Sequence, residues 1–125
     1  GAAADARLHT ASRKDYAEAA ATVLTSTEDQ TGKVYELAGD SGYTLAEYAA
    51  EIAKQSGKTI NYQNMTEEAF TDLLVQVGLP EGFAALLADS EVQAQQGALA
   101  EASGTLAQLI GRQTTPISQS ITEAL

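Results

Sequence analysis

The sequence predicts a helix-rich α/β fold in which six helices accompany two or three short strands. Three observations support this prediction. Apolar residues recur at helical spacing directly after residues that commonly cap helices. Two other segments are apolar and β-prone over short lengths, as strands are. The chain has 125 residues and is 44% hydrophobic, which suits a packed domain rather than a disordered chain. We therefore expect residues 1–125 to form a single unit.

Two helices have clear starts in the sequence. Ser12 is followed by Asp15, and Thr44 by Glu47, which is the spacing of a capping box. Gly57 is suited to end the second of these helices, because glycine readily takes the left-handed conformation of a C-cap. The side chains expected to face inward are Tyr16, Ala20, Val23 and Leu24 in the first helix and Leu45, Tyr48, Ala49, Ile52 and Ala53 in the second.

Four further helices follow along the chain. We expect the third to begin at Thr66 and end before Gly78, and the fourth to carry Pro80 in its first turn. Gly111 closes a short fifth helix, and Pro116 begins the last. The side chains expected to face inward are Ala69, Phe70, Leu73, Leu74 and Val77, then Phe83, Leu86 and Leu87, then Leu106, Leu109 and Ile110, and finally Ile117, Ile121 and Leu125.

The strand candidates are residues 33–38 ("KVYELA"), residues 59–64 ("TINYQN") and, more weakly, residues 7–11 ("RLHTA"). In the second candidate Ile60 and Tyr62 share one side, which suits a half-covered strand near a sheet edge. The first candidate has apolar residues on both sides and is expected to be covered by helices on both faces. Because so few short strands make a marginal sheet, we expect them to belong to a sheet that continues elsewhere.

The composition excludes several classes of function. A net charge of −10 opposes binding to nucleic acid and to anionic membranes, and the seven basic residues form no cluster. Without cysteine the chain has no disulfide and no thiolate metal site. It has neither an apolar run of the roughly 20 residues that span a bilayer nor a signal peptide. We expect a soluble, cytoplasmic protein. Its sequence begins at Gly1 without an initiator methionine, as an expressed piece, a processed product or an internal fragment would.

Residues 33–58 follow the order of a dinucleotide-binding unit, namely strand, glycine turn and helix. Such a unit needs the pattern G-x-G-x-x-G, whose glycines let the pyrophosphate approach a helix N-terminus. This turn offers only Gly39 and Gly42, and Asp40 between them would repel a phosphate. We therefore interpret the stretch as an ordinary turn before a well-capped helix, and we assign no cofactor-binding residue.

No residue of the chain can be assigned a catalytic or metal-binding role from its pattern. His9 is the single histidine, and as a general base it would need an orienting carboxylate, for which Asp5 is a guess. A solvated or capping role for His9 is favoured over a catalytic one. Arg112 could bind an anion, although complementing the C-terminus of the fifth helix is the simpler role.

The clustered acidic residues also have simple interpretations. Glu67 and Glu68 stand at the start of the third helix, where negative charge is favourable. Asp89 and Glu91 lie in "LADSEV", which we interpret as a solvated helix face. No tyrosine is followed four positions later by lysine, the pair that many short-chain dehydrogenases use for proton transfer.

Four segments together resemble the C-terminal part of the NmrA-like atypical short-chain dehydrogenases and reductases, especially the bacterial NAD(P)H:quinone oxidoreductases among them. They are "RLHTASRKDYAEAAATVLT", "GKVYELAGDSGYTLAEYAAEIAKQSGKTINYQN", "GLPEGFAALLADSEV" and "LAQLIGRQTTPISQSI". The resemblance runs from about Arg7 to Ile121. Each piece is weak alone, but their order and spacing make a specific set.

This resemblance implies a fold and a missing part. The chain would be the helix-rich C-terminal portion of a Rossmann-type NAD(P)-binding fold together with substrate-lobe helices, and the N-terminal dinucleotide-binding half would be absent. Residues 33–38 would be a strand of the larger sheet, and residues 59–64 would belong to the lobe. Asp15 in "RKDYAEAA" is similar to the family's helix-opening aspartate, and no catalytic role is carried over to it.

The function implied by the resemblance is binding of substrate in an NAD(P)H-dependent reductase of quinone-like apolar acceptors. The full protein would use NADP or NAD, whereas this chain alone would bind no cofactor and be inactive. The segment "GLPEGFAALL" resembles the piece that lines the substrate pocket, so Phe83 and Leu87 are candidates for substrate contact, with a core role as the alternative. The implied partners are the N-terminal half, a quinone-like small molecule and a second copy in a homodimer.

Two other functions remain open at this point. NmrA-like proteins include non-enzymatic members that sense dinucleotide and act through protein partners, so the chain could belong to a regulatory or binding module. It could also be a stand-alone acidic α/β domain that shares only a fold with the family. The regulatory alternative is tested by whether the missing half keeps both a cofactor loop and a hydride-accepting pocket. The stand-alone alternative is tested by whether this chain folds cooperatively as a monomer.

Overall fold

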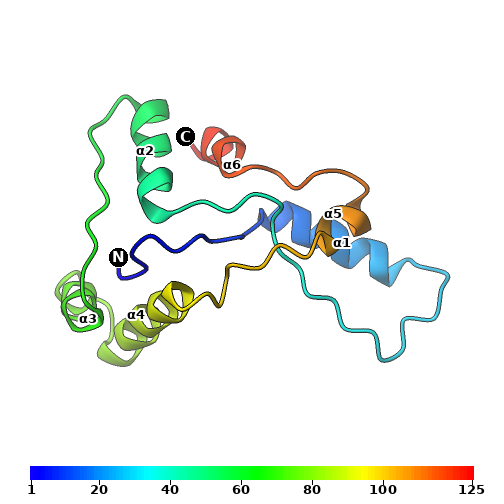
Figure 1. Cartoon of the computed structure of the whole chain (residues 1–125), viewed down its shortest axis with the longest axis horizontal. Coiled ribbons are helices and arrows are strands. Elements are labelled where there is room, and N and C mark those ends of the chain that lie inside the picture. The colour runs from blue at the N-terminus through cyan, green and yellow to red at the C-terminus, as the bar shows by residue number, and fades with distance from the viewer. The chain divides into compact units, whose positions relative to one another are not determined.

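The computed structural model describes all 125 residues and contains six helices (Figure 1). Their bounds are α1 Arg13–Leu24, α2 Leu45–Ser56, α3 Glu67–Gln76, α4 Glu81–Gln95, α5 Thr105–Ile110 and α6 Ile117–Ala124. All six helices predicted from the sequence are confirmed. Gly57 and Gly111 end α2 and α5 in the left-handed conformation, with φ of 68° and 69°. None of these helices has both the length and the apolar character that crossing a membrane requires.

The helices begin where the capping residues predict. The Ser12 hydroxyl accepts a hydrogen bond from the Asp15 backbone N–H at the start of α1. At α2 the box is complete, because Thr44 accepts from the Glu47 N–H and the Glu47 carboxylate accepts from the Thr44 N–H. Pro80 lies at the N-cap of α4, one position before the first turn in which it was expected. Its φ of −58° suits either position.

The two or three predicted strands are not confirmed. The 125 residues contain one isolated antiparallel bridge, between Leu8 and Tyr43, and no longer ladder. A strand exists only where backbone donors and acceptors alternate with those of a neighbour. Residues 33–38 have no such neighbour here, and residues 59–64 have a single such bond, which the Gln63 carbonyl accepts from Gly1. The expectation that residues 33–38 are covered on both faces is also wrong, because Val34 is 84% exposed.

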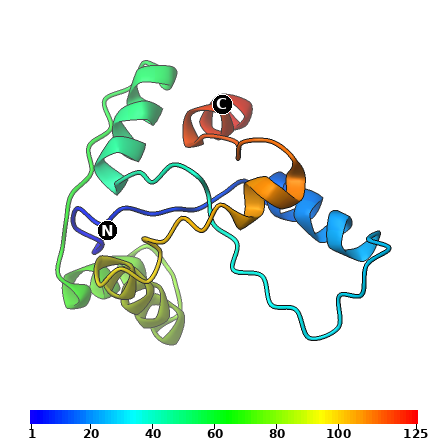
Figure 2. The ribbon, with the colours of Figure 1, turned by 45° about the vertical axis from the view of Figure 1, so that its right-hand side comes forward.

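The chain divides into two compact units, and unit 1 comprises residues 1–8 and 43–100. It holds α2, α3 and α4, and α3 and α4 lie side by side (Figures 1 and 2). Small residues dominate its interior. The buried apolar residues of unit 1 are Ala2, Ala3, Leu8, Ala84, Ala88 and Ala94.

The inward face predicted for α4 is wrong in part. Phe83 and Leu86 are 51% and 58% exposed, whereas Leu87 is half-buried. The alanines of α4 take the interior positions instead, since Ala84 and Ala88 are fully buried. The neighbouring α3 buries none of its residues completely. The result is a pair of helices that leaves several large apolar side chains in contact with solvent.

Unit 2 comprises residues 9–42 and 101–125 and holds α1, α5 and α6. Helices α1 and α5 pack against each other, as the blue and orange ribbons show in both views (Figures 1 and 2). The apolar residues buried in unit 2 are Ala19, Leu106 and Ile121. The predicted inward face of α1 is wrong in part. Tyr16 and Val23 are half-buried, but Leu24 is 85% exposed, and the residues that α1 buries are Asp15 and Ala19.

Candidate functional site

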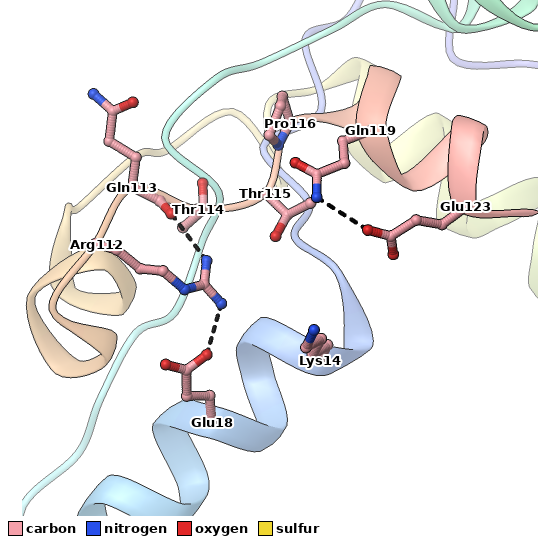
Figure 3. A pocket seen from close by; sticks show the side chains of 9 residues that line it. All are labelled: Lys14, Glu18, Arg112, Gln113, Thr114, Thr115, Pro116, Gln119 and Glu123. Carbon is pink, nitrogen blue, oxygen red and sulfur yellow. Dashed lines mark hydrogen bonds and ion pairs between the residues drawn. The ribbon is translucent and has the colours of Figure 1, made fainter. Parts of the chain in front are cut away.

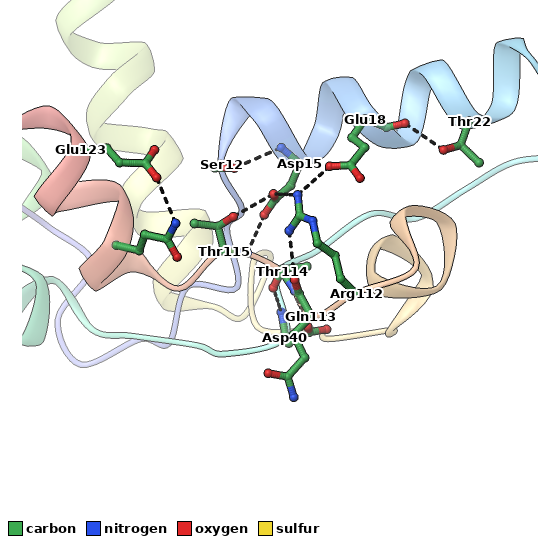
Figure 4. A network of polar contacts seen from close by, with 11 residues as sticks. Ser12, Asp15, Glu18, Thr22, Asp40, Arg112, Gln113, Thr114, Thr115 and Glu123 are labelled. Atoms are coloured by element: carbon green, nitrogen blue, oxygen red, sulfur yellow. Dashed lines mark hydrogen bonds and ion pairs between the residues drawn. The ribbon is translucent and has the colours of Figure 1, made fainter.

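A buried carboxylate organises the polar interior of unit 2. The side chain of Asp15 is fully buried. Its Oδ1 accepts from Arg112 Nη2 at 2.8 Å and from Thr115 Oγ1 at 2.9 Å, and its Oδ2 accepts from the Thr115 backbone N–H at 2.7 Å (Figure 4). Helix α1 places Asp15 one turn after its cap, so the carboxylate faces the segment that joins α5 to α6.

These contacts keep Asp15 ionised. Burial alone would raise the pKa of its carboxyl group, but the hydrogen bonds from Arg112 and Thr115 outweigh burial and hold the pKa below the ordinary value of 3.8. A carboxylate whose two oxygens already accept three donors has little capacity left to take a proton from a substrate. Asp15 therefore acts as an anchor between α1 and residues 112–115.

Arg112 has a role that sequence reasoning did not find. Its Nη2 also contacts Glu18 Oε2 at 2.6 Å, and its Nη1 donates to the Gln113 carbonyl at 3.0 Å. The hydrogen bonds that the guanidinium donates to Asp15, and then to Glu18, raise the pKa of Arg112. Arg112 is thus bound to acidic side chains of α1, which neither of its two expected roles, anion binding or complementing the C-terminus of α5, describes.

The glycine turn at residues 39–42 is held by the same segment. The Asp40 N–H donates to Thr114 Oγ1 at 2.8 Å, and the Thr114 N–H donates to Asp40 Oδ2 at 2.8 Å. Nearby, the Gly39 N–H donates to the His9 carbonyl at 2.8 Å, and His9 Nδ1 lies 3.2 Å from the Gly39 carbonyl oxygen. The turn is therefore held by His9 on one side and by Thr114 on the other.

A polar hollow of about 500 Å³ borders this network (Figure 3). Both signs of charge line it, with Arg112 and Glu18 paired across one side. Its lining residues are Lys14, Glu18, Arg112, Gln113, Thr114, Thr115, Pro116, Gln119 and Glu123. Such a lining suits water or a polar group and is unsuited to an apolar aromatic acceptor.

A second, mostly apolar hollow of about 400 Å³ lies in unit 1. Its lining residues are Gly1, Leu45, Tyr48, Ala49, Ile52, Ile60, Asn61, Tyr62, Gln63, Met65, Phe70 and Glu91. Glu91 is half-buried, and its carboxylate accepts a hydrogen bond from the Ala2 N–H. The expectation that Glu91 lies on a solvated face is therefore wrong. Burial, followed by the charge of Glu91, raises the pKa of the Tyr62 hydroxyl.

The two predicted substrate contacts lie outside both hollows. Phe83 and Leu87 stand one turn apart on α4, the first half-exposed and the second half-buried. The exposure of Phe83 shows that it is not a core residue of this chain. The described residues include no cluster of three or more histidine, cysteine, aspartate or glutamate side chains that could hold a metal ion.

Solved structures of reductases superpose on this chain over less than half of their own length. A triphenylmethane reductase from Citrobacter superposes with a TM-score of 0.90 and 32% identity, over 98% of this chain and 42% of its own. A further structure of that reductase contains NADP(H). An NADPH-dependent quinone oxidoreductase from Escherichia coli superposes with a TM-score of 0.93 and 50% identity, over 99% of this chain and 45% of its own.

The chain is similar in sequence to quinone oxidoreductase 2 of Escherichia coli. The two are 52% identical over 121 residues, which are 97% of this chain and 42% of that relative. No family model matches the chain. The resemblance to quinone-reducing enzymes that the sequence motifs indicate is thereby confirmed, for a chain that spans less than half the length of the relative it matches.

Proposed function

We propose that this chain is the substrate-binding, C-terminal part of an NADPH-dependent oxidoreductase that reduces quinone-like apolar acceptors. The observation that carries the proposal is the 52% identity to quinone oxidoreductase 2 of Escherichia coli over 121 residues. The solved structure of the quinone oxidoreductase in complex with NADPH supports NADPH as the cofactor of the longer protein. The part of that relative that this chain does not span would supply the dinucleotide-binding half.

In this proposal unit 1 belongs to the lobe that receives the acceptor. NADPH, held by the longer protein, supplies a hydride, and the acceptor takes this hydride and a proton to become a hydroquinone while NADP⁺ forms. The residues of this chain would exclude water and orient the ring. Phe83 and Leu87 are the proposed contacts, because a half-exposed aromatic ring on α4 offers an apolar surface to a planar acceptor.

The exposed apolar side chains also bear on the proposed partners. Val77, Phe83 and Leu86 are all more than half exposed on or beside the pair α3 and α4. Surfaces of this kind favour association, so the N-terminal half of the same protein is the proposed partner of this chain. A homodimer is proposed as the second partner arrangement.

The test compares this chain with the longer protein from the same gene. NADPH is titrated into both by calorimetry, and NADPH oxidation is followed with a soluble quinone. We expect only the longer protein to bind NADPH and to oxidise it in the presence of the quinone. Phe83→Ser in the longer protein should raise KM for the quinone several-fold with a smaller change in kcat.

Other outcomes would redirect the proposal. NADPH binding without quinone reduction would favour the dinucleotide-sensing regulatory module over the enzyme. NADPH binding by the 125-residue chain alone would overturn the interpretation of residues 39–42 as an ordinary turn. A longer protein that binds no NADPH would overturn both the enzyme and the sensor.

A further inference from the structure

The backbone at Gly1 makes the hydrogen bonds of a parallel strand pair. The Gly1 nitrogen donates to the Gln63 carbonyl at 3.1 Å, and the Gly1 carbonyl accepts from the Met65 N–H at 2.8 Å. A residue that bonds through both its nitrogen and its carbonyl to two residues spaced two apart on a neighbour is the repeating element of a parallel ladder. Gly1 therefore stands opposite Asn64, with both segments running in the same direction.

The segment that pairs with Gly1 extends upstream as residues 59–63. Apart from the Gln63 carbonyl, no backbone N–H or C=O of residues 59–63 is bonded to another backbone group of the chain. Backbone groups alternate in direction along an extended segment. In the register that Gly1 sets, the N–H of Gln63 and both backbone groups of Asn61 face the side on which Gly1 lies.

An apolar hollow adjoins this unpaired edge. Ile60, Asn61, Tyr62 and Gln63 all line the hollow of about 400 Å³, and apolar side chains of α2 line it as well. Contact at Gly1 is close, because a Cβ added there would lie 2.6 Å from Glu91 Oε2 and 3.0 Å from the Tyr62 ring. The segment that enters at Gly1 is thus held tightly against residues 62–65, while the space upstream of it is open.

We propose that the extended segment leading into Gly1 in the longer protein pairs with residues 59–63 as a parallel strand and fills this hollow with apolar side chains. The inference rests on the proposed function only in that this chain is part of a longer reductase. Its occupant follows from the register at Gly1, since a strand continued backwards from that residue reaches Gln63 and then Asn61. The hollow is then a strand-binding groove, and the acceptor binds elsewhere.

Amide hydrogen exchange measured by NMR tests this pairing residue by residue. We expect the amides of Asn61 and Gln63 to exchange at least about 100-fold more slowly in the longer protein than in the 125-residue chain. Asn61→Pro removes the Asn61 N–H and one rung of the proposed pairing, and should therefore weaken the protection of the neighbouring Gln63 amide in the longer protein. Asn61→Ala keeps the backbone N–H and should leave that protection in place, so the two variants separate the backbone bond from the side chain.

Two results would overturn the inference. In the first, Asn61 and Gln63 exchange at the same rate in both proteins. In the second, protection arises in the 125-residue chain and grows with its concentration, which would make a second copy the occupant. The measurement needs neither NADPH nor quinone. If the longer protein shows this protection but binds no NADPH, the strand pairing stands and the proposed function fails. If it binds NADPH but shows no protection, the proposed function stands and the strand pairing fails.

Discussion

Replacement of Asp15 by asparagine is the sharpest test of how unit 2 is held together. In the wild-type chain Arg112 Nη2, Thr115 Oγ1 and the Thr115 N–H converge on two carboxylate oxygens at 2.7 to 2.9 Å. Asparagine has nearly the same shape but offers one oxygen and one NH₂ group. At least one of the three donors then faces another donor and loses its acceptor.

The cost follows from this count. A buried donor left without an acceptor costs about 1 to 3 kcal/mol, and bonds to a neutral oxygen are weaker by about 1 kcal/mol than bonds to a charged one. Because Arg112 keeps its contact with Glu18, part of the loss is offset. We expect Asp15→Asn to lower the free energy of unfolding by about 3 kcal/mol, which is roughly a hundredfold in the unfolding equilibrium.

Urea denaturation followed by circular dichroism measures this change. Glu18→Gln is the matched control, because Glu18 binds the same Nη2 of Arg112 but reaches solvent. Solvent-exposed ion pairs contribute up to about 1 kcal/mol, so the control should be nearly as stable as the wild type. Equal destabilisation by the two variants, or an Asp15→Asn chain within about 0.5 kcal/mol of the wild type, would refute the reasoning.

The destabilisation caused by Asp15→Asn should depend on pH, and the lowered pKa of Asp15 gives the direction of that dependence. The pKa of Asp15 is lowered in the folded chain from 3.8, so the carboxylate contributes stability that is fully present above that value. The contribution is lost as the pH falls below 3.8 and through the lower folded-state pKa. The difference in stability between wild type and Asp15→Asn should therefore be constant at neutral pH and shrink in strongly acidic solution.

Three further substitutions test separate features. Thr44→Ala removes the cap that accepts from the Glu47 N–H and should cost about 1 kcal/mol in urea denaturation, whereas Thr44→Ser should cost less. Gly39→Ala places a Cβ 2.2 Å from the Thr10 carbonyl oxygen, so it should lower the thermal midpoint by several degrees; an unchanged midpoint would contradict this contact. Phe83→Ser removes a half-exposed ring and should leave stability within about 0.5 kcal/mol of the wild type, which a large loss would contradict.

The helices could be predicted because their signals are local. A cap such as Ser12 or Thr44 acts on an N–H three residues away, and Gly57 ends a helix through its own backbone. Such signals do not depend on contacts with distant parts of the chain. For the same reason the fold class was predicted correctly in its helices and not in its strands, since residues 33–38 and 59–64 need a neighbour that local sequence does not reveal.

The buried faces were harder to predict than the helices themselves. Helical periodicity marks Phe83 and Leu86 as inward, yet the interior of α4 is taken by Ala84 and Ala88. An alanine face allows close approach of helices. Where alanines and large apolar residues alternate along a helix, the sequence alone does not show which set faces the interior. The exposed set, with Phe83 in it, is also where apolar contacts to a substrate or a partner were expected.

The Asp15 cluster could not be predicted at all. Asp15 was interpreted as part of a capping box with Ser12 and as a helix-opening aspartate, both of which are roles at the helix start. Its partner Thr115 lies 100 residues further along the chain. Neither the composition nor the spacing of a single sequence links residues so far apart. The one local signal is that Asp15 lies one turn from Ala19, on the helix face that is buried in the structure.

The division of unit 2 into residues 9–42 and 101–125 has a consequence for synthesis on the ribosome. Helix α1 is translated before residues 43–100, but Arg112 and Thr115, which donate to its buried carboxylate, are translated only after them. Until then Asp15 has to stay hydrated, because burial of an unpaired charge is strongly unfavourable. Unit 1 can therefore close first around α3 and α4, and a ribosome stalled before Arg112 would hold a chain in which α1 is still undocked.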